Sequence, residues 1–538
     1  MGNDRKILLQ NGFIVDGTGE KGWIGSLLIS NGYIKEIAER EMNIDCEVVD
    51  CTGKVISPGF IDVHSHNDWF LPLDDVETFT DPFVRQGITT SLCGNCGFGV
   101  AGFKKKTKYI DKVCNNPFKA SGIEIKWSTM GEYFDILSKN GIPINLANLV
   151  GHGTTRTSIK GYSSSPMTKD EMKELLKLLG RAMDDGAKGV SIGLQYEPGV
   201  FSTMDELRMV AKLVKKKNKV LTSHARASSI VSGTYPIKPF GKAHNILALK
   251  DMINLAKETG VKLQFSHLIF VGEKTWNTFE ETMKLIDKAI LDGVDIKFDI
   301  YPYTCGASIL SVVFPEWFMA KIPGAFENKG DLTRLKIEIA AMKKMVGFGY
   351  EDIQIAFIDH PELKEFNGRF ITDIAGELNL PLFETFMLFA KHSNGKCRVM
   401  QYKFGNQNII EELMKHPASM FMTDAWVERE GTQNPASFGS FPRFLQMSNE
   451  RDILPIETVI HKMTKAVADR FDIKDRGVLK KGNAADITVF DWNEVRDNTS
   501  SSKMNMPPRG IEHVFMNGCW VLRDGEPYER TRAGVILK

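Results

Sequence analysis

The chain has 538 residues, of which 42% are hydrophobic and 25% charged, proportions close to the averages of globular proteins. Its 68 basic and 67 acidic residues give a formal net charge of +1, so the basic excess typical of nucleic-acid binders is absent. The N-terminal segment lacks an apolar stretch long enough for a secretion signal, and no run of about 18 apolar residues predicts a membrane span. These features predict a cytoplasmic globular protein that binds neither nucleic acid nor membranes.

Short β-like runs separated by turn signals occupy both ends of the chain. Asn-Gly and Asp-Gly pairs, which favour tight turns, follow several of these runs, among them Asn11-Gly12 and Asn517-Gly518. Strands need partners, so we expect residues 1–56 and 480–538 to combine into one small β-sandwich domain.

Residues 57–479 alternate β-like runs with helix-like segments, the pattern of a parallel α/β fold. The clearest helical stretches are Lys169–Asp184 and Met204–Lys217. Eight such units predict a TIM-like (β/α)8 barrel with its chemistry at the carboxyl ends of the strands, and an insertion of about 306–375 precedes the last strand. The eight β-like runs are Phe60–His64, Thr89–Leu92, Ile144–Val150, Gly189–Leu194, Val220–His224, Lys262–His267, Asp295–Tyr301 and Ser419–Thr423.

Potential metal ligands fall at the carboxyl ends of five of these runs. His64 and His66 are two residues apart in an extended segment, so their side chains point the same way. Imidazole, thiolate and carboxylate together are the ligand set expected for zinc. The six candidates are His64, His66, Cys96, His224, His267 and Asp424.

Each candidate taken alone also has a structural explanation. A single strand-end histidine is more often a hydrogen-bonded polar residue, and an aspartate after a strand is often a helix N-cap. Cys93 and Cys96 could form half of a structural zinc site, although no second C-x-x-C pair completes it. The occurrence of all six at the same end of the barrel favours a metal centre.

Several motifs resemble a known family. The segment Ser57–His66 resembles the first-strand signature of the amidohydrolase superfamily, and Gly94-Asn95-Cys96-Gly97 resembles the N-acyl-D-amino-acid deacylase (D-aminoacylase) branch. The resemblance spans nearly the whole chain. Its other motifs are Gly87–Thr90, Leu149–Gly153, Asp299–Thr304, Gly439–Arg443, Asp475–Gly477 and Gly482–Asp486.

The resemblance implies a role for each candidate residue. Cys96, with His224 and His267, would hold a tightly bound Zn²⁺, while His64 and His66 would form a second, weakly occupied site. Asp424 would be the general acid/base, and Glu197 is a rival ligand. Tyr301 would contact the substrate. The implied reaction is zinc-dependent hydrolysis of a linear amide, converting an N-acyl-D-amino acid to a D-amino acid and a carboxylate.

The substrate side departs from the pattern of the branch. Where the branch has His-Pro-Arg, with an arginine for the substrate carboxylate, this chain has Asn434-Pro435-Ala436, and Ala307 replaces an expected serine. Alanine cannot hold a carboxylate. We expect Arg226 to replace this arginine, with Arg429 and Arg443 as rivals, and His152 to line the pocket or orient a ligand.

These departures leave other functions open. One alternative is hydrolysis of a cyclic amide or imide, as in dihydropyrimidinase-like relatives, and another is an amide that lacks the usual carboxylate. A non-catalytic binding or scaffold protein is less favoured, because all six candidate residues are retained. The sequence does not indicate an oligomeric state.

Overall fold

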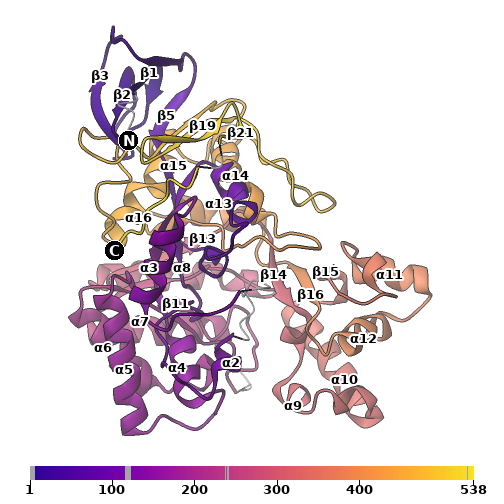
Figure 1. Cartoon of the computed structure of the whole chain (residues 1–538). Coiled ribbons are helices and arrows are strands. Elements are labelled where there is room, and N and C mark those ends of the chain that lie inside the picture. The colour runs from indigo at the N-terminus through magenta and orange to yellow at the C-terminus, as the bar shows by residue number, and fades with distance from the viewer. Residues whose placement is uncertain (1–5, 115–122, 237, 239–240, 530) are drawn as a thin grey trace.

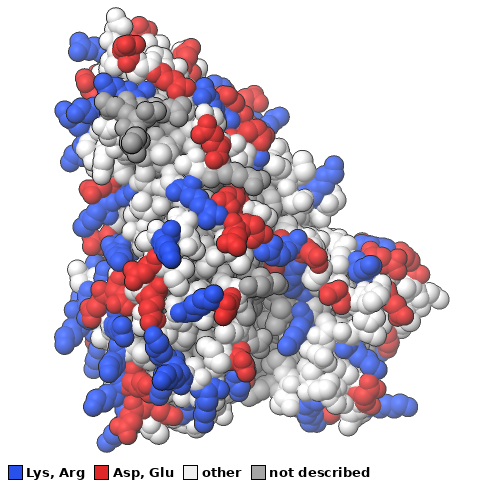
Figure 2. Space-filling model, viewed as in Figure 1, with Lys and Arg blue, Asp and Glu red and all other residues white. Residues whose placement is uncertain are grey.

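The computed structural model describes residues 6–114, 123–236, 238, 241–529 and 531–538, and Figure 1 shows three parts. A barrel of strands and helices lies in the middle, a sheet built from both chain ends lies above it, and a smaller lobe projects from one side. Basic and acidic side chains are interspersed over the face shown in Figure 2. Within the described residues, no helix is both long and apolar enough to cross a membrane.

Both ends of the chain contribute to one nine-stranded sheet. The sheet runs in the order β21-β20-β19-β18-β5-β1-β2-β3, and β4 also pairs with β1. β5 joins the two ends, because it pairs in parallel with β1 and antiparallel with β18. Residues of both ends share one buried core. The strands are β1 (Lys6–Ile14), β2 (Trp23–Ser30), β3 (Tyr33–Ala38), β4 (Glu47–Asp50), β5 (Val55–Pro58), β18 (Ile487–Phe490), β19 (Ile511–Met516), β20 (Cys519–Arg523) and β21 (Glu526–Pro527).

One of the predicted turns is a bulge. Asn517-Gly518 does connect two antiparallel strands, β19 and β20. Asn11-Gly12 instead lies inside β1, where the pairing with β2 shifts register between Leu9 and Gly12 and Asn11 has φ of 62°. An extra residue in one strand of a pair produces this shift, so the turn predicted here was wrong.

The eight predicted runs all contain strands of the barrel, the third split into two. These are β6 (Phe60–Asp62), β7 (Ile88–Cys93), β8 (Asn145–Asn148), β9 (Val150–Gly151), β10 (Gly189–Gly193), β11 (Val220–His224), β12 (Lys262–Phe265), β13 (Ile296–Ile300) and β17 (Ser419–Phe421). Parallel pairing forms two arcs, β6-β7-β8 and β9-β10-β11-β12-β13-β17. Residues just after β6 and β17 join the arcs, since the Asp424 amide donates to the His64 carbonyl over 2.9 Å.

Amphipathic helices connect the barrel strands. In α5 (Lys169–Asp184), Met172, Leu175 and Leu179 are buried at helical spacing, and a capping box at Thr168 starts the helix where predicted. The other helices are α1 (Glu77–Val84), α2 (Ile110–Cys114), α3 (Met130–Asn140), α4 (His152–Lys160), α6 (Met204–Lys216), α7 (His244–Thr259), α8 (Phe279–Leu291), α13 (Gln407–Lys415), α14 (Ala436–Glu450), α15 (Ile456–Met463) and α16 (Lys465–Arg470).

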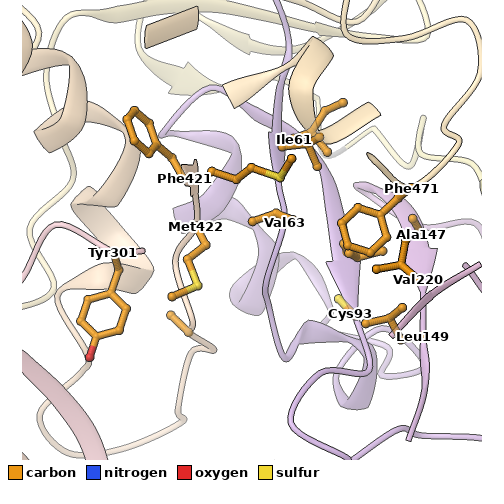
Figure 3. Close-up of a cluster of buried hydrophobic side chains, with 14 of the residues drawn as sticks. Ile61, Val63, Cys93, Ala147, Leu149, Val220, Tyr301, Phe421, Met422 and Phe471 are labelled. Atoms are coloured by element: carbon orange, nitrogen blue, oxygen red, sulfur yellow. The ribbon is translucent and has the colours of Figure 1, made fainter. Parts of the chain in front are cut away.

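Apolar side chains fill the centre of the barrel (Figure 3). Cys93 belongs to this core and lies beside Leu149 in Figure 3. Burial and the nearby charge of Asp68 hold the pKa of the Cys93 thiol well above its usual value. Cys93 is absent from the possible metal-binding groups formed by the described residues, so Cys93 and Cys96 do not act as a pair.

The lobe in Figure 1 forms from an insertion between β13 and β17. We call residues 305–402 the inserted region. Its sheet runs β14-β16-β15 and is antiparallel, and its own core includes Phe314, Phe386 and Val399. The predicted end of the insertion, near residue 375, falls inside α11. The insertion continues beyond it, because residues of α12 and β16 also belong to this core. The elements are β14 (Cys305–Ile309), α9 (Glu316–Met319), α10 (Lys329–Val346), β15 (Ile353–Phe357), α11 (Ile371–Leu378), α12 (Leu382–His392) and β16 (Arg398–Tyr402).

Candidate metal centre

The fold brings the six predicted residues together at the carboxyl ends of the barrel strands. They form two groups that share Cys96, and within each group the potential ligand atoms lie within 4.8 Å of one another. One group consists of Cys96, His224 and His267, and the other of His64, His66, Cys96 and Asp424. The first group consists of the three residues expected to hold one zinc, and the second adds Cys96 and the expected acid/base Asp424 to His64 and His66.

The imidazoles surround the thiol and the carboxylate at short range. Cys96 Sγ lies 3.4 Å from Nε2 of His64 and 3.6 Å from Nε2 of His267. Asp424 Oδ1 lies 3.2 Å from Nε2 of His64 and 3.3 Å from Nε2 of His66. The Asp424 side chain keeps 24% of its exposure, whereas those of His64 and His66 keep 0% and 1%. The carboxylate therefore lies on the open side of the cluster.

Three of these residues have an unusual backbone conformation. Cys96, His267 and Asp424 have φ of 56°, 32° and 49°, in the left-handed region that non-glycine residues seldom occupy outside functional sites and turns. Gly97, which follows Cys96, has φ of 79°, and a Cβ there would lie 2.9 Å from the Gly193 amide nitrogen. The Gly-Asn-Cys-Gly motif thus permits a tight turn that presents the thiol.

Hydrogen bonds orient the imidazoles toward the cluster. Asp299 Oδ1 lies 3.3 Å from His64 Nδ1 and accepts from the backbone amide of His267 over 2.7 Å. Gln195 Oε1 lies 3.1 Å from His224 Nε2, while Nδ1 of His224 is buried and lacks a hydrogen-bond partner within the described part of the chain. Carboxylates and amides commonly orient metal-binding imidazoles in this way. The unpartnered Nδ1 suits a ligand atom.

Electrostatics favour the charged forms of the thiol and the carboxyl. Burial raises the pKa of Cys96, but the charge of His64 and hydrogen bonds from His224 and His267 outweigh it and hold that pKa well below its usual value. Burial likewise opposes ionisation of Asp424, yet His64 and His66 hold its pKa well below normal. A thiolate, imidazoles and a carboxylate at this spacing fit a zinc ion.

Comparisons with known proteins agree with this geometry. Residues 47–301 match a model of the amidohydrolase family. The N-acyl-D-glutamate deacylase of Alcaligenes xylosoxydans xylosoxydans is 26% identical over 536 residues, covering 99% of this chain and 96% of the relative. The chain is thus similar to the amidohydrolase family over residues 47–301. The D-aminoacylase of the same organism is 24% identical over 532 residues, covering 99% and 97% of the two chains.

Solved structures share the fold of this chain along its whole length. The N-acyl-D-glutamate deacylase of Bordetella bronchiseptica, crystallised with zinc and a phosphonate mimic of the tetrahedral intermediate, superposes with a TM-score of 0.79. It is 26% identical and covers 99% of this chain and 100% of its own. L-Hydantoinase from Arthrobacter aurescens, 14% identical, has a TM-score of 0.57 and covers 99% of each chain.

Sequence reasoning missed several residues around the centre. The Tyr196 hydroxyl donates to the Cys96 carbonyl over 2.8 Å, and its ring packs edge-on against His224 at 4.8 Å. Gln195 and Tyr196 lie two and three residues after the end of β10, so their position near a strand end was the available signal. Glu197, the rival ligand, is exposed and lies outside both ligand groups.

The predicted substrate contacts lie in different surroundings. Tyr301 is 6% exposed, and burial together with the charge of Asp424 raises its pKa well above normal, which places its phenol within the field of that carboxylate. His152 is fully buried, with Nε2 2.8 Å from Glu206 Oε1, so the structure does not bring it to the ligand groups. Arg226 donates to the carbonyls of Val200 and Ser202 over 2.8 and 2.5 Å.

The rival arginines are paired with carboxylates. Arg429 binds both oxygens of Asp75, over 2.7 and 3.1 Å. Arg443 lies 3.3 Å from Asp497 and donates to a backbone carbonyl over 2.8 Å. Ala436 is buried at the start of α14. Among these three arginines, Arg226 is the one whose partners in the described part of the chain are neutral carbonyls and not carboxylates.

Proposed function

We propose that this protein is a zinc-dependent hydrolase of linear N-acyl amides, with N-acyl-D-amino acids as its substrates. The observation that carries the proposal is the pair of ligand groups sharing Cys96, with a partly open carboxylate beside them. The two N-acyl-D-glutamate deacylases and the D-aminoacylase named above support this substrate class. Residues Cys96, His224 and His267 would hold one zinc, and His64 and His66 a second.

Zinc in this centre would acidify water and polarise the amide carbonyl. His64 and His66 hold the pKa of Asp424 well below its usual value, which favours its carboxylate form. Its carboxylate takes a proton as water attacks the carbonyl carbon and the new C–O bond forms. The same group then returns that proton to the nitrogen as the C–N bond breaks, so that the amine leaves neutral. Tyr301 would orient the substrate beside Asp424.

The proposal is tested by zinc analysis together with hydrolysis assays on matched N-acetyl-D- and N-acetyl-L-amino acids. We expect bound zinc and turnover of the D series. Asp424→Asn should lower kcat by about 10²–10⁴-fold, the usual contribution of a general acid/base, while retaining the zinc held by the Cys96, His224 and His267 group. Asp452→Asn is the matched control, because Asp452 also has a left-handed backbone (φ of 50°) but is exposed.

Two results would contradict the proposal. Wild-type protein without bound zinc, prepared without chelators, would refute the metal centre. Turnover of a hydantoin or dihydrouracil with none of the N-acyl-D-amino acids would favour the cyclic-amide alternative instead. The likeness to hydantoinase is at 14% identity and shows the fold alone.

A further inference from the structure

A row of partly exposed side chains leads from the metal centre to the inserted region. After β17 the chain alternates, with Asp424, Trp426 and Glu428 partly exposed and Ala425 and Val427 buried. Asp424 and Trp426 both adjoin His66, and the Trp426 indole in turn contacts Glu428. Trp426 therefore lies near the proposed general acid/base, with Glu428 beyond it.

Trp426 is fixed at both of its ends. Its ring packs edge-to-face against His66, with centroids 5.8 Å apart and an interplanar angle of 85°. Its indole Nε1 donates to Glu428 Oε1 over 2.7 Å. The backbone of Glu428 is held in turn, since its amide donates to Gln433 Oε1 over 2.9 Å and its carbonyl accepts from Gln433 Nε2 over 3.1 Å. One aromatic wall is therefore locked beside the ligand group that contains His66.

The inserted region supplies a cation, Arg398, that pairs with Glu428. Arg398, the first residue of β16, lies with NH1 3.0 Å from the same Glu428 oxygen. The Arg398 guanidinium also bonds the Glu430 carbonyl and lies 5.0 Å above the Phe357 ring. Arg398 is thereby committed to Glu428 and the loop, so an anionic ligand would have to compete with an existing carboxylate. The carboxylate beside Trp426 would repel a second negative charge.

We propose that Trp426 is the specificity-determining wall of the substrate pocket, and that Glu428 and Arg398 are its positioning residues. Resting on the proposed function, this assigns to the enzyme substrates that carry an uncharged, apolar group next to the scissile amide, on the acyl chain or on the amino-acid side chain. Substrates with an acidic side chain are disfavoured. The inserted region thus takes part in substrate selection through Arg398.

The test compares kcat/KM on four substrates: N-acetyl-D-alanine, N-acetyl-D-leucine, N-hexanoyl-D-alanine and N-acetyl-D-glutamate. The leucine and hexanoyl compounds distinguish a side-chain contact from an acyl-chain contact. Trp426→Ala should lose at least about tenfold in kcat/KM on whichever apolar substrate contacts the wall, relative to N-acetyl-D-alanine, because small changes of apolar contact have effects of this size. The loss should fall mainly in KM.

Three further variants separate positioning from general damage. Glu428→Gln keeps an acceptor for the indole but removes the charge, so it should raise the relative kcat/KM for N-acetyl-D-glutamate. Arg398→Met removes the cation that holds Glu428, and Trp426→Phe removes the N–H that binds Glu428, so both leave the aromatic ring less fixed. Each should weaken the preference for the apolar substrate over N-acetyl-D-alanine, as Trp426→Ala does.

The inserted region provides a matched control. Trp317 Nε1 donates to Glu338 Oε2 over 2.8 Å, and Arg334 lies 2.8 Å from the other oxygen, Oε1, of Glu338. This second Trp–Glu–Arg set lies on α9 and α10, outside the ligand groups. Trp317→Phe and Arg334→Met should leave the ranking of the four substrates unchanged.

Each result decides a different question. If the wild type hydrolyses none of the four substrates, the proposed function fails, and this inference with it. If the wild type is active but Trp426→Ala lowers all four substrates equally, the inference alone is refuted. It is also refuted if the control variants alter the ranking as much as Arg398→Met does.

Discussion

Glu206→Gln tests what a buried ion cluster contributes to this fold. Glu206 Oε1, near the start of α6, lies 2.8 Å from His152 Nε2, 3.1 Å from Arg156 Nε and 3.2 Å from the Ser202 hydroxyl. The side chains of Glu206 and Arg156 are 2% and 0% exposed. The substitution keeps the shape of residue 206 but leaves the Arg156 charge buried without its counter-ion.

Leaving a buried charge uncompensated typically costs about 3–5 kcal/mol. We expect the lower end of this range, because glutamine still offers Arg156 one acceptor. Burial would raise the pKa of Glu206, but the hydrogen bond from His152 and the charge of Arg156 outweigh it and hold that pKa below normal. The contribution is therefore complete above the unfolded-state pKa of about 4.3, and it is lost as the pH falls through the folded-state value.

Equilibrium urea unfolding at pH 7 and at several values down to about pH 3 measures this effect, because the loss begins below the unfolded-state pKa. The difference in unfolding free energy between wild type and variant should be constant near neutral pH and shrink at the acidic end. Glu384→Gln is the control, because Glu384 pairs with Lys336 over 2.9 Å at the surface, where such pairs contribute about 0–1 kcal/mol. A loss for Glu206→Gln no larger than for this control, or one independent of pH, would refute the reasoning.

Two substitutions test the turn that carries the thiol. Cys96→Ala removes the ligand shared by both groups, so purified protein should hold less zinc than wild type by atomic absorption; unchanged zinc content would exclude Cys96 as a ligand. Gly97→Ala forces a side chain into a backbone with φ of 79° and a contact 2.9 Å from the Gly193 nitrogen, which should destabilise the protein by about 1–3 kcal/mol. An unchanged unfolding midpoint and zinc content would show that the turn tolerates a side chain.

The convergence of the six candidate ligands could be predicted because their positions depend on short-range patterns. β-Like runs locate the barrel strands, and the fold places their carboxyl ends at one edge. His64, His224 and Asp424 therefore converge even though they are far apart in sequence. The split of the third strand into β8 and β9, and the bulge at Asn11-Gly12, depend instead on pairing with distant strands, which no local pattern contains.

The hydrogen-bond partners of His152 and Arg226 could not be predicted either, because they also depend on residues that are distant in the sequence. Both follow barrel strands, so their positions agree with the prediction. Their side chains find partners in residues 200–206, and a buried or half-buried polar group takes whichever acceptor the fold supplies. The inserted region shows the same limit, because its true extent depends on the core shared by residues from β14 through β16.

Arg226 is the arginine that a substrate carboxylate can recruit most readily. Arg429 and Arg443 already bind carboxylates, so exchanging one carboxylate for another gains little, whereas the partners of the Arg226 guanidinium among the described residues are two neutral carbonyls. Charged hydrogen bonds contribute about 1.5–3 kcal/mol, more than neutral ones. Arg226→Met should therefore raise KM for N-acetyl-D-alanine at least tenfold, because a loss of about 1.4 kcal/mol corresponds to a factor of ten. It should not raise KM for N-acetyl-D-alaninamide, which lacks the carboxylate. Equal losses on both compounds would instead mean that Arg226 only supports the backbone of Val200 and Ser202.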